Sequence, residues 1–194
     1  MYHAVADTVL ANSLLRSLPE VVDSDVGLSG FSWGGVIAST VIGIDDRFKF
    51  AIPTYGCGHM FDARNRWGAS LGNNEVYKQV WDPMVRIANA TMPVLWFSWP
   101  EDEHFPMENL AHTYHAAAGT RMVSLKPAMG HGRNFNSPEP YDFAASIISG
   151  DGPWCVQQNL NLVDNTATVV FDATKILNSA SLVYRTSNRP IITN

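Results

Sequence analysis

The sequence contains no run of lysine or arginine, and its formal net charge is -5. Nucleic acids and anionic membranes are bound largely through clustered positive charge, so we expect neither as a partner. No stretch reaches the length of about 18 consecutive apolar residues that a membrane-spanning helix needs. Residues 1–15 lack the charged segment and apolar block of a signal peptide. We therefore expect a soluble chain and leave its localisation open.

Cysteine is also scarce. Cys57 and Cys155 are the only two, and they match no spacing typical of metal ligands or redox motifs. A disulfide and two thiols both remain open, and buried thiols are favoured because free cysteine packs as a small core residue. His112 and His115 have the i, i+3 spacing of helix-borne metal ligands, but no third ligand accompanies them. We expect neither a metal nor another cofactor.

The 194 residues, 46% hydrophobic and 16% charged, are typical of one substantial globular domain. Apolar runs typical of buried strands occupy residues 26–31, 48–56, 93–99 and 121–127. Helical patterns occupy residues 2–18, 34–44, 75–90, 108–119 and 137–148, with Gly119 and Gly150 expected to end the last two. Strands that alternate with helices predict a doubly wound α/β layer, a mostly parallel sheet of about four strands covered on both faces.

The pattern changes after Gly152. Two short alternating segments, 159–173 and 179–187, suit antiparallel strands, and Asp164-Asn165 interrupts the first of them with a turn. We therefore predict two parts. Residues 1–152 form the catalytic core, and residues 153–194 form a small β-rich extension.

The pattern Gly-x-Ser-x-Gly spans residues 30–34, directly after the first predicted strand and before a predicted helix. This is the context of a nucleophile elbow, a tight turn that exposes a serine hydroxyl. Small residues on both sides of Ser32 would permit the turn, and the amide of Trp33 would face a developing oxyanion. The alternative is a glycine-rich turn whose serine only caps the helix. The strand and helix context favours Ser32 as nucleophile, with Phe31 and Trp33 beside the substrate.

A serine hydroxyl needs an imidazole to accept its proton, and the imidazole needs a carboxylate to orient it. In this kind of fold the acid and then the base follow the serine, each in a loop after a later strand. The loop after the third strand contains Asp102 between Glu101 and Glu103, and we favour Asp102 because a shorter side chain suits a tight loop. The loop after the fourth strand contains His131 between two glycines. We predict His131 as the base.

Two other histidines lie near these loops. His104 belongs to the loop that contains Asp102, the acid loop, and we interpret it as a residue at the rim of the site rather than as the base. His59 follows the second strand, where it could line the pocket or belong to an ordinary loop. Neither is needed for the predicted chemistry.

Several segments of this sequence, taken in their order along the chain, resemble those of bacterial α/β-hydrolases of the acetylxylan esterase and dienelactone hydrolase group, especially the prolyl-oligopeptidase-like esterases. The similar segments extend over most of residues 2–150 and are YHAVADTVLANSLLRSLPEV, VGLSGFSWGG, DDRFKFAIPTYGCG, WDP, MPVLW, DEHFP and MGHG. The resemblance implies Ser32 as nucleophile, Asp102 as acid and His131 as base.

The chain departs from this group because the strands that normally precede the helix at 2–18 are absent. One of the missing loops normally supplies the second oxyanion donor. Tyr55, after the second strand, is a possible substitute through its hydroxyl, and a packed aromatic ring is the alternative. The strand that ends at Ser32 would also become a sheet edge, which proteins usually pair or cover. We expect formation of a homo-oligomer, or the C-terminal β segment, to protect this edge.

The leading hypothesis is a serine carboxylic-ester hydrolase that forms an acyl-enzyme on acetyl or other short-chain esters. Its partner would be a small-molecule ester, with acetylated carbohydrate as one candidate. A peptidase of oligopeptidase type is an alternative within catalysis. A non-catalytic fragment that acts as a binding module is an alternative outside it.

Overall fold

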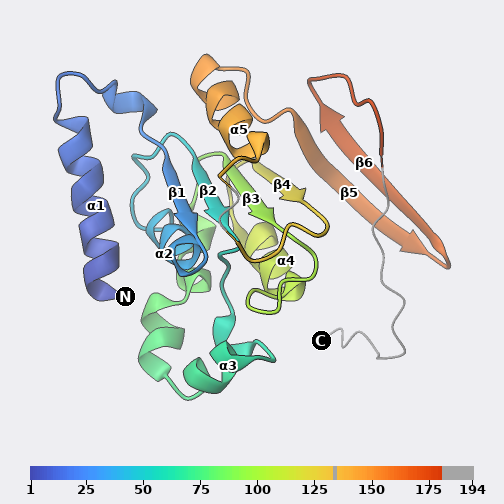
Figure 1. The fold of residues 1–194 in the computed structure, drawn as a ribbon, viewed down its shortest axis with the longest axis horizontal. Coiled ribbons are helices and arrows are strands. Elements are labelled where there is room, and N and C mark those ends of the chain that lie inside the picture. The colour runs from blue at the N-terminus through green and yellow to red at the C-terminus, as the bar shows by residue number, and fades with distance from the viewer. Residues whose placement is uncertain (133–134, 181–194) are drawn as a thin grey trace.

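A computed structural model describes residues 1–132 and 135–180 of the chain. A parallel sheet in the order β1-β2-β3-β4 forms its centre (Figure 1). The strands are β1 (Leu28–Phe31), β2 (Ala51–Thr54), β3 (Val94–Ser98) and β4 (Arg121–Leu125). Leu28 pairs with Ala51 in the register, and Val94 pairs with Arg121. The four predicted strands are confirmed, although each is shorter than its apolar run.

Both faces of the sheet carry apolar side chains, because alternate residues of a strand point to opposite sides. On one face, Val94 and Trp96 lie in a core shared with α2 and α4. On the other face, Leu95 and Phe97 pack in a second core with Phe143 of α5. The predicted doubly wound α/β layer is confirmed.

Five α-helices accompany the sheet in the described residues. They are α1 (Tyr2–Arg16), α2 (Trp33–Val41), α3 (Arg66–Leu71), α4 (Met107–Ala116) and α5 (Pro138–Ser149). Two short 3-10 segments, η1 (Asp23–Asp25) and η2 (Met60–Asp62), lie in connecting loops. Gly150 ends α5 in the left-handed conformation, at φ 85°, as predicted.

Residues 75–90 do not form the single helix that the pattern predicted. They form a π turn and two 3-10 turns, η3 (Tyr77–Trp81), η4 (Pro83–Val85) and η5 (Ile87–Asn89). The break comes at Asp82, because proline disfavours a helical conformation in the residue before it. The Asp82 side chain instead accepts a hydrogen bond from the Met84 amide at 3.0 Å. Asp82 thus caps η4, with Pro83 in its first turn.

Two further helix predictions need correction. α4 ends at Ala116 because Ala117 is already extended, so Gly119 does not end it. A Cβ on Gly119 would lie 2.3 Å from the Met92 carbonyl oxygen, and close packing explains that glycine. α3 lies in a segment, between residues 56 and 75, for which the sequence pattern predicted neither a helix nor a strand.

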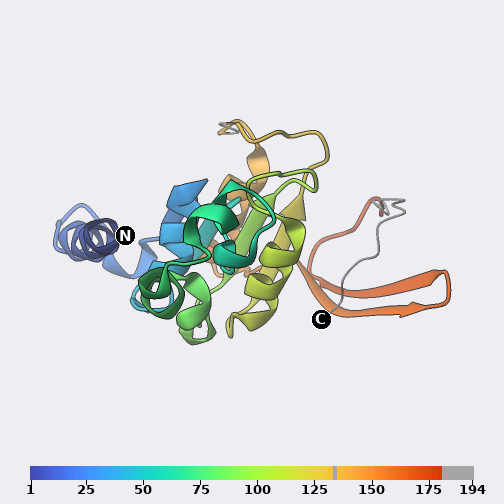
Figure 2. The same ribbon diagram turned by 90° about the horizontal axis from the view of Figure 1, so that it is seen from below.

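The C-terminal part forms an antiparallel hairpin of β5 (Cys155–Val163) and β6 (Thr166–Ala173). The turn at Asp164-Asn165 is as predicted, and the second alternating segment, 179–187, extends outside the described residues. The hairpin lies on the β4 side and projects away from the sheet (Figure 1, Figure 2). The hairpin, which is the described part of the C-terminal β segment, does not cover β1, since β1 and β4 are opposite edges. The division at residue 152 stays a prediction.

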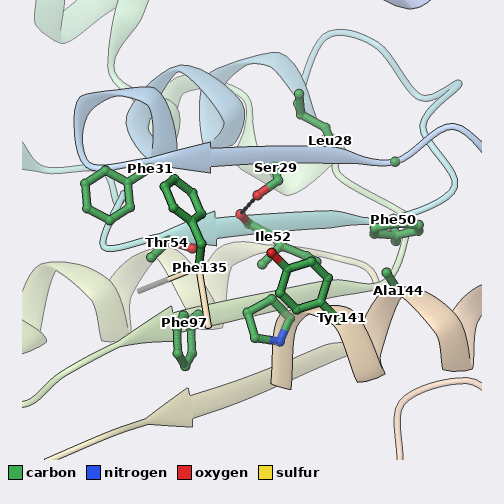
Figure 3. A pocket seen from close by; sticks show the side chains of 12 residues that line it. Leu28, Ser29, Phe31, Phe50, Ile52, Thr54, Phe97, Phe135, Tyr141 and Ala144 are labelled. Carbon is green, nitrogen blue, oxygen red and sulfur yellow. Dashed lines mark hydrogen bonds between the residues drawn. The ribbon is translucent and has the colours of Figure 1, made fainter. Parts of the chain in front are cut away.

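A groove of about 380 Å³ lies on the sheet face beside α5, where β1 and β2 carry no helix (Figure 3). Its lining includes Phe31, Ile52, Phe97 and Tyr141. A parallel sheet normally buries both faces under helices. This part of the second face is therefore apolar surface without a cover in the described chain.

The outer edge of β1 borders this groove. The amides of Leu28 and Ser32 donate to β2, so the alternate residues Ser29 and Phe31 direct their backbone groups away from it. Within the part of the chain that the structure describes, no strand pairs with this edge. The expected edge position of this strand is confirmed.

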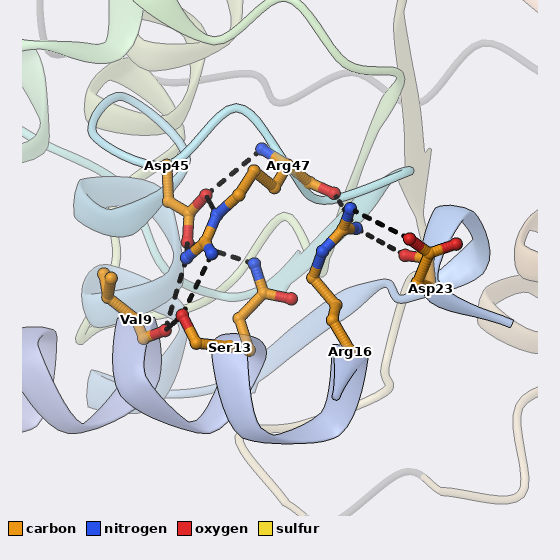
Figure 4. Close-up of polar contacts among 7 residues, drawn as sticks. Val9, Ser13, Arg16, Asp23, Asp45 and Arg47 are labelled. Carbon is orange, nitrogen blue, oxygen red and sulfur yellow. Dashed lines mark hydrogen bonds and ion pairs between the residues drawn. The ribbon is translucent and has the colours of Figure 1, made fainter. Parts of the chain in front are cut away.

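A polar cluster ties α1 to the loop between α2 and β2 (Figure 4). The Arg47 guanidinium donates to both carboxylate oxygens of Asp45 at 2.7 Å and to the Ser13 hydroxyl and Val9 carbonyl of α1. Asn12 donates to the same carboxylate at 3.0 Å. The hydrogen bonds from Arg47 lower the pKa of the nearly buried Asp45 from 3.8 to about 2.

The apolar side chains of α1 are only partly buried. Val5 is buried, whereas Tyr2, Leu10 and Leu14 are each 64–65% exposed. The helix therefore presents an exposed apolar surface of its own.

Two remaining expectations concern the thiols and the membrane. Cys57 and Cys155 are free, with Cys57 buried and Cys155 partly buried, so the favoured thiol interpretation is confirmed. None of the helices in residues 1–132 and 135–180 combines the length and apolar character needed to cross a bilayer.

Candidate active site

Ser32 lies in the turn between β1 and α2. Its backbone angles, φ 57° and ψ -123°, lie outside the regions that ordinary residues favour, at a cost of about 1–3 kcal/mol. The Ser32 amide donates to the Thr54 carbonyl of β2 at 3.0 Å and holds the turn against the sheet. This is the strained strand-to-helix geometry of a nucleophile elbow.

Close backbone packing explains two of the glycines around this turn. A Cβ on Gly30 would lie 2.1 Å from the Gly34 carbonyl oxygen, which excludes a larger residue at position 30. A Cβ on Gly34 would meet nothing within 4 Å, so the predicted steric need for a small residue there is wrong. Gly35 has that role instead, because its Cβ would lie 2.7 Å from the Thr54 carbonyl oxygen. α2 therefore packs directly on the end of β2.

His131 extends from the loop after β4 toward the elbow. Its Nε2 lies 2.8 Å from the Ser32 hydroxyl oxygen, and its side chain is 21% exposed. Gly130, which precedes it, has φ 74°, a left-handed conformation that glycine adopts readily. The structure brings the predicted nucleophile and base into hydrogen-bond contact.

Asp102 lies in the loop after β3, and its side chain is 0% exposed. One carboxylate oxygen, Oδ2, lies 2.8 Å from His131 Nδ1. The other, Oδ1, accepts hydrogen bonds from the amides of His104 and Phe105 at 2.7 and 3.1 Å. Every oxygen of this buried carboxylate thus has a partner, whereas the neighbouring Glu101 and Glu103 are exposed. The three predicted side chains form one hydrogen-bonded series.

Aromatic rings surround the His131 imidazole. Phe105 is nearly parallel to it, with ring centroids 5.6 Å apart, and Phe31 is tilted at 5.8 Å. His104 approaches edge-on at 4.9 Å, which places it beside the imidazole rather than in contact with the serine. Such packing restricts the orientations available to the ring.

The predicted oxyanion and substrate residues take different positions. The Trp33 amide is the first of α2, so it has no carbonyl partner within the helix, while the indole ring lies 4.8 Å from that of Trp67. Tyr55 is fully buried, and its hydroxyl donates to the Gly130 carbonyl at 2.7 Å. Its single hydroxyl proton is therefore directed to the loop that contains His131 and not to an oxyanion site. The alternative of a packed aromatic ring describes Tyr55 better.

Asn65 supports the acid loop and was not predicted. Its Nδ2 donates to the carbonyls of Glu103 and His104 at 2.7 and 3.0 Å, while its Oδ1 caps α3 by accepting from the Trp67 amide at 2.9 Å. An asparagine before a short helix is a weak capping signal. Nothing in the sequence connects it to a loop so far along the chain.

Other reactive side chains make poorer candidates. Burial raises the pKa of the Cys57 thiol well above its usual value, which disfavours the nucleophilic thiolate. The His59 ring lies 5.3 Å from that of His112, with Nδ1 3.7 Å from an Asp62 carboxylate oxygen. Across the described residues, no three His, Cys, Asp or Glu side chains gather in a way that could hold a metal ion.

Solved structures share the fold. Acetyl xylan esterase from Paenibacillus sp. R4 has a TM-score of 0.62 at 22% identity, over 73% of this chain and 51% of that one. Acetyl xylan esterase 1 from Thermoanaerobacterium sp. JW/SL YS485 has a TM-score of 0.60 at 17% identity, over 74% and 52%. Dipeptidyl peptidase 4 from Porphyromonas gingivalis has a TM-score of 0.63 at 16% identity, over 75% and 22%.

Identities this low establish the fold alone, and the chain spans about half the length of the two esterases. No curated protein matches the chain in sequence. A family model, in contrast, matches residues 2–147, which is most of the chain. This match confirms the resemblance inferred from the sequence motifs. The chain belongs to the dienelactone hydrolase family.

Proposed function

We propose that the chain is a serine carboxylic-ester hydrolase with Ser32 as nucleophile, His131 as base and Asp102 as orienting acid. One observation carries the proposal. Ser32 Oγ lies 2.8 Å from His131 Nε2, and His131 Nδ1 lies 2.8 Å from Asp102 Oδ2. These are the contacts by which an imidazole accepts a serine proton while a carboxylate stabilises the imidazolium.

The chemistry proceeds in two steps. Ser32 Oγ attacks the acyl carbon as its proton passes to His131 Nε2, and the alcohol leaves with that proton. Water then attacks the acyl-enzyme, gives a proton to His131 and releases the acid, and the serine recovers its proton. The Trp33 amide stabilises the oxyanion in both steps. Because an imidazolium cannot accept a proton, the neutral form of His131 is the one that acts as base.

The proposed substrates are acetyl and other short-chain esters, with acetylated carbohydrate as one candidate. Membership of the dienelactone hydrolase family and the likeness to two acetyl xylan esterases support an ester as the substrate, rather than another acyl compound such as an amide. Among the described residues one candidate oxyanion donor, the Trp33 amide, is identified, and each such donor is worth on the order of 10²–10³ in turnover. We therefore expect slow reactions that favour activated esters.

A peptidase is the second candidate. Dipeptidyl peptidase 4 and the acylaminoacyl peptidase from Pyrococcus horikoshii share the fold over 75% and 68% of this chain. Amides need more transition-state stabilisation than esters, however, so a single identified oxyanion donor favours ester cleavage.

The proposal is tested with p-nitrophenyl acetate. Wild type should release p-nitrophenol, and Ser32→Ala should reduce turnover to the level of residual hydrolysis. Ser39→Ala, which removes a buried hydroxyl from α2 outside the site, is the matched control and should behave as wild type. Equal turnover by wild type and Ser32→Ala would favour a non-catalytic binding module instead.

We further propose that copies of the chain associate through the β1 side. The unpaired edge of β1, the groove beside α5 and the exposed leucines of α1 are the supporting observations. Exposed edge strands and apolar patches of this kind favour association.

A further inference from the structure

We propose that Tyr55 is a positioning residue that holds the base loop, residues 126–132, in the conformation in which His131 reaches Ser32. This inference rests on the proposed function, because it takes His131 as the base. It gives the Tyr55 hydroxyl a role that differs from that of a substitute oxyanion donor and adds to that of a packed aromatic ring, the two alternatives that the sequence left open.

The contact between Tyr55 and the loop is specific. The Tyr55 hydroxyl donates to the Gly130 carbonyl at 2.7 Å, and the Gly132 amide donates to the same oxygen at 3.0 Å. This carbonyl belongs to the peptide bond that joins Gly130 to His131. Two donors to one oxygen fix the plane of that peptide, and with it the direction in which the imidazole leaves the backbone.

The Tyr55 ring supports the same histidine. Its centroid lies 4.6 Å from that of the His131 ring, with the two planes inclined by 36°. Phe31 packs edge-on against Tyr55 at 5.2 Å. Tyr55 is 0% exposed, so bulk water does not compete for its hydrogen bond to the loop.

Tyr55 also connects the loop to the central sheet. Its amide donates to the Phe97 carbonyl of β3 at 2.8 Å, and its φ of 64° is a left-handed conformation that costs a non-glycine residue free energy. The base loop itself contains left-handed backbone at Ala128 and Gly130. A side chain fixed at the end of β2 therefore supports a loop that is irregular.

The test compares Tyr55→Phe, which keeps the ring and removes the hydroxyl, with Tyr114→Phe, which removes the hydroxyl of a buried tyrosine on α4. We expect Tyr55→Phe to lower kcat for p-nitrophenyl acetate about 10-fold, because small displacements of catalytic groups are costly. KM and the thermal unfolding midpoint should stay close to the wild-type values. Tyr114→Phe should leave kcat unchanged. An unchanged kcat in Tyr55→Phe would overturn the inference.

A double-mutant comparison separates positioning from direct oxyanion binding. In a His131→Ala background, Tyr55→Phe should have no further effect on residual turnover if it acts through the imidazole. A loss as large as in wild type would overturn the positioning role.

Hydrogen exchange gives a readout that does not depend on activity. The amides of residues 128–132 should exchange faster in Tyr55→Phe than in wild type or Tyr114→Phe, and unchanged exchange would contradict the inference. Turnover by wild type no greater than that of Ser32→Ala would instead refute the proposed function, while the exchange result would still decide whether Tyr55 holds the loop.

Discussion

His131 Nδ1 lies 2.8 Å from Asp102 Oδ2, and the carboxylate that it meets is fully buried. Two backbone amides of the same loop hold the other carboxylate oxygen. The carboxylate therefore has a fixed direction, and it favours the tautomer in which Nδ1 carries the proton and Nε2 faces Ser32. The catalytic proposal depends on this orientation as much as on the presence of the three residue types.

Asp102→Asn tests that orientation. An amide can donate a hydrogen bond to Nδ1, which favours the wrong tautomer and removes the charge that stabilises the imidazolium. We expect kcat to fall by about 10³- to 10⁴-fold. The measurement is p-nitrophenyl acetate hydrolysis, with Glu103→Gln, an exposed carboxylate in the same loop, as the control. Similar activities of the two variants would remove Asp102 from the mechanism.

Asp45→Asn tests the link between α1 and the core. Arg47 lowers the pKa of Asp45 from 3.8 to about 2, so the carboxylate stabilises the fold above pH 3.8 and loses this effect as the pH falls toward 2. We expect the variant to lose about 1–2 kcal/mol of unfolding free energy at neutral pH. The measurement is urea denaturation from pH 7 to pH 2.

The difference in unfolding free energy between wild type and Asp45→Asn should become smaller below pH 4. Asp46→Asn, at the exposed neighbouring position, should match wild type throughout. A difference that stays constant down to pH 2 would show that charge on Asp45 is not its source.

Ser29→Lys tests association through β1. The Ser29 side chain is exposed and lines the groove, and lysine on an edge strand opposes pairing with another strand. We expect wild type to be oligomeric and Ser29→Lys to shift toward the monomer. The measurement is the molar mass in solution by light scattering. Ser24→Lys adds the same charge at an exposed position in η1 and should not shift the distribution. A wild-type monomer at all concentrations would refute the proposal.

A paired assay separates the two catalytic candidates. With p-nitrophenyl acetate and an aminoacyl p-nitroanilide at matched concentrations, we expect the ester to be cleaved at least about 100-fold faster relative to its uncatalysed rate. The reason is that the described residues offer one candidate oxyanion donor, and each donor is worth about 10²-fold or more. Preference for the anilide would reverse the order of the candidates.

The sequence located the strands, the elbow and the two loops because these depend on local patterns. A buried parallel strand is a continuous apolar run, and each proposed catalytic residue follows the end of such a run. The sequence favours Asp102 over Glu101 and Glu103 as the acid because its side chain is shorter. The structure adds a physical reason, since the two backbone amides that hold this carboxylate come from its own loop.

Features that depend on contacts between distant segments were missed. Asn65 supports the acid loop across a large sequence separation, and Gly35 is required by the close approach of β2. The residues after Glu75 match a helical period, yet Pro83 breaks the helix into turns. The hairpin was recognised from its alternation, but its position beside β4 depends on packing that alternation does not encode.

Labelling with a fluorophosphonate probe, followed by mass spectrometry of the modified peptide, tests the central claim most directly. The probe reacts with serines whose hydroxyl is activated by a neighbouring base. The account predicts stoichiometric modification of wild type at Ser32 and none in Ser32→Ala. Failure of the folded wild-type protein to react, or modification at another residue, would contradict it.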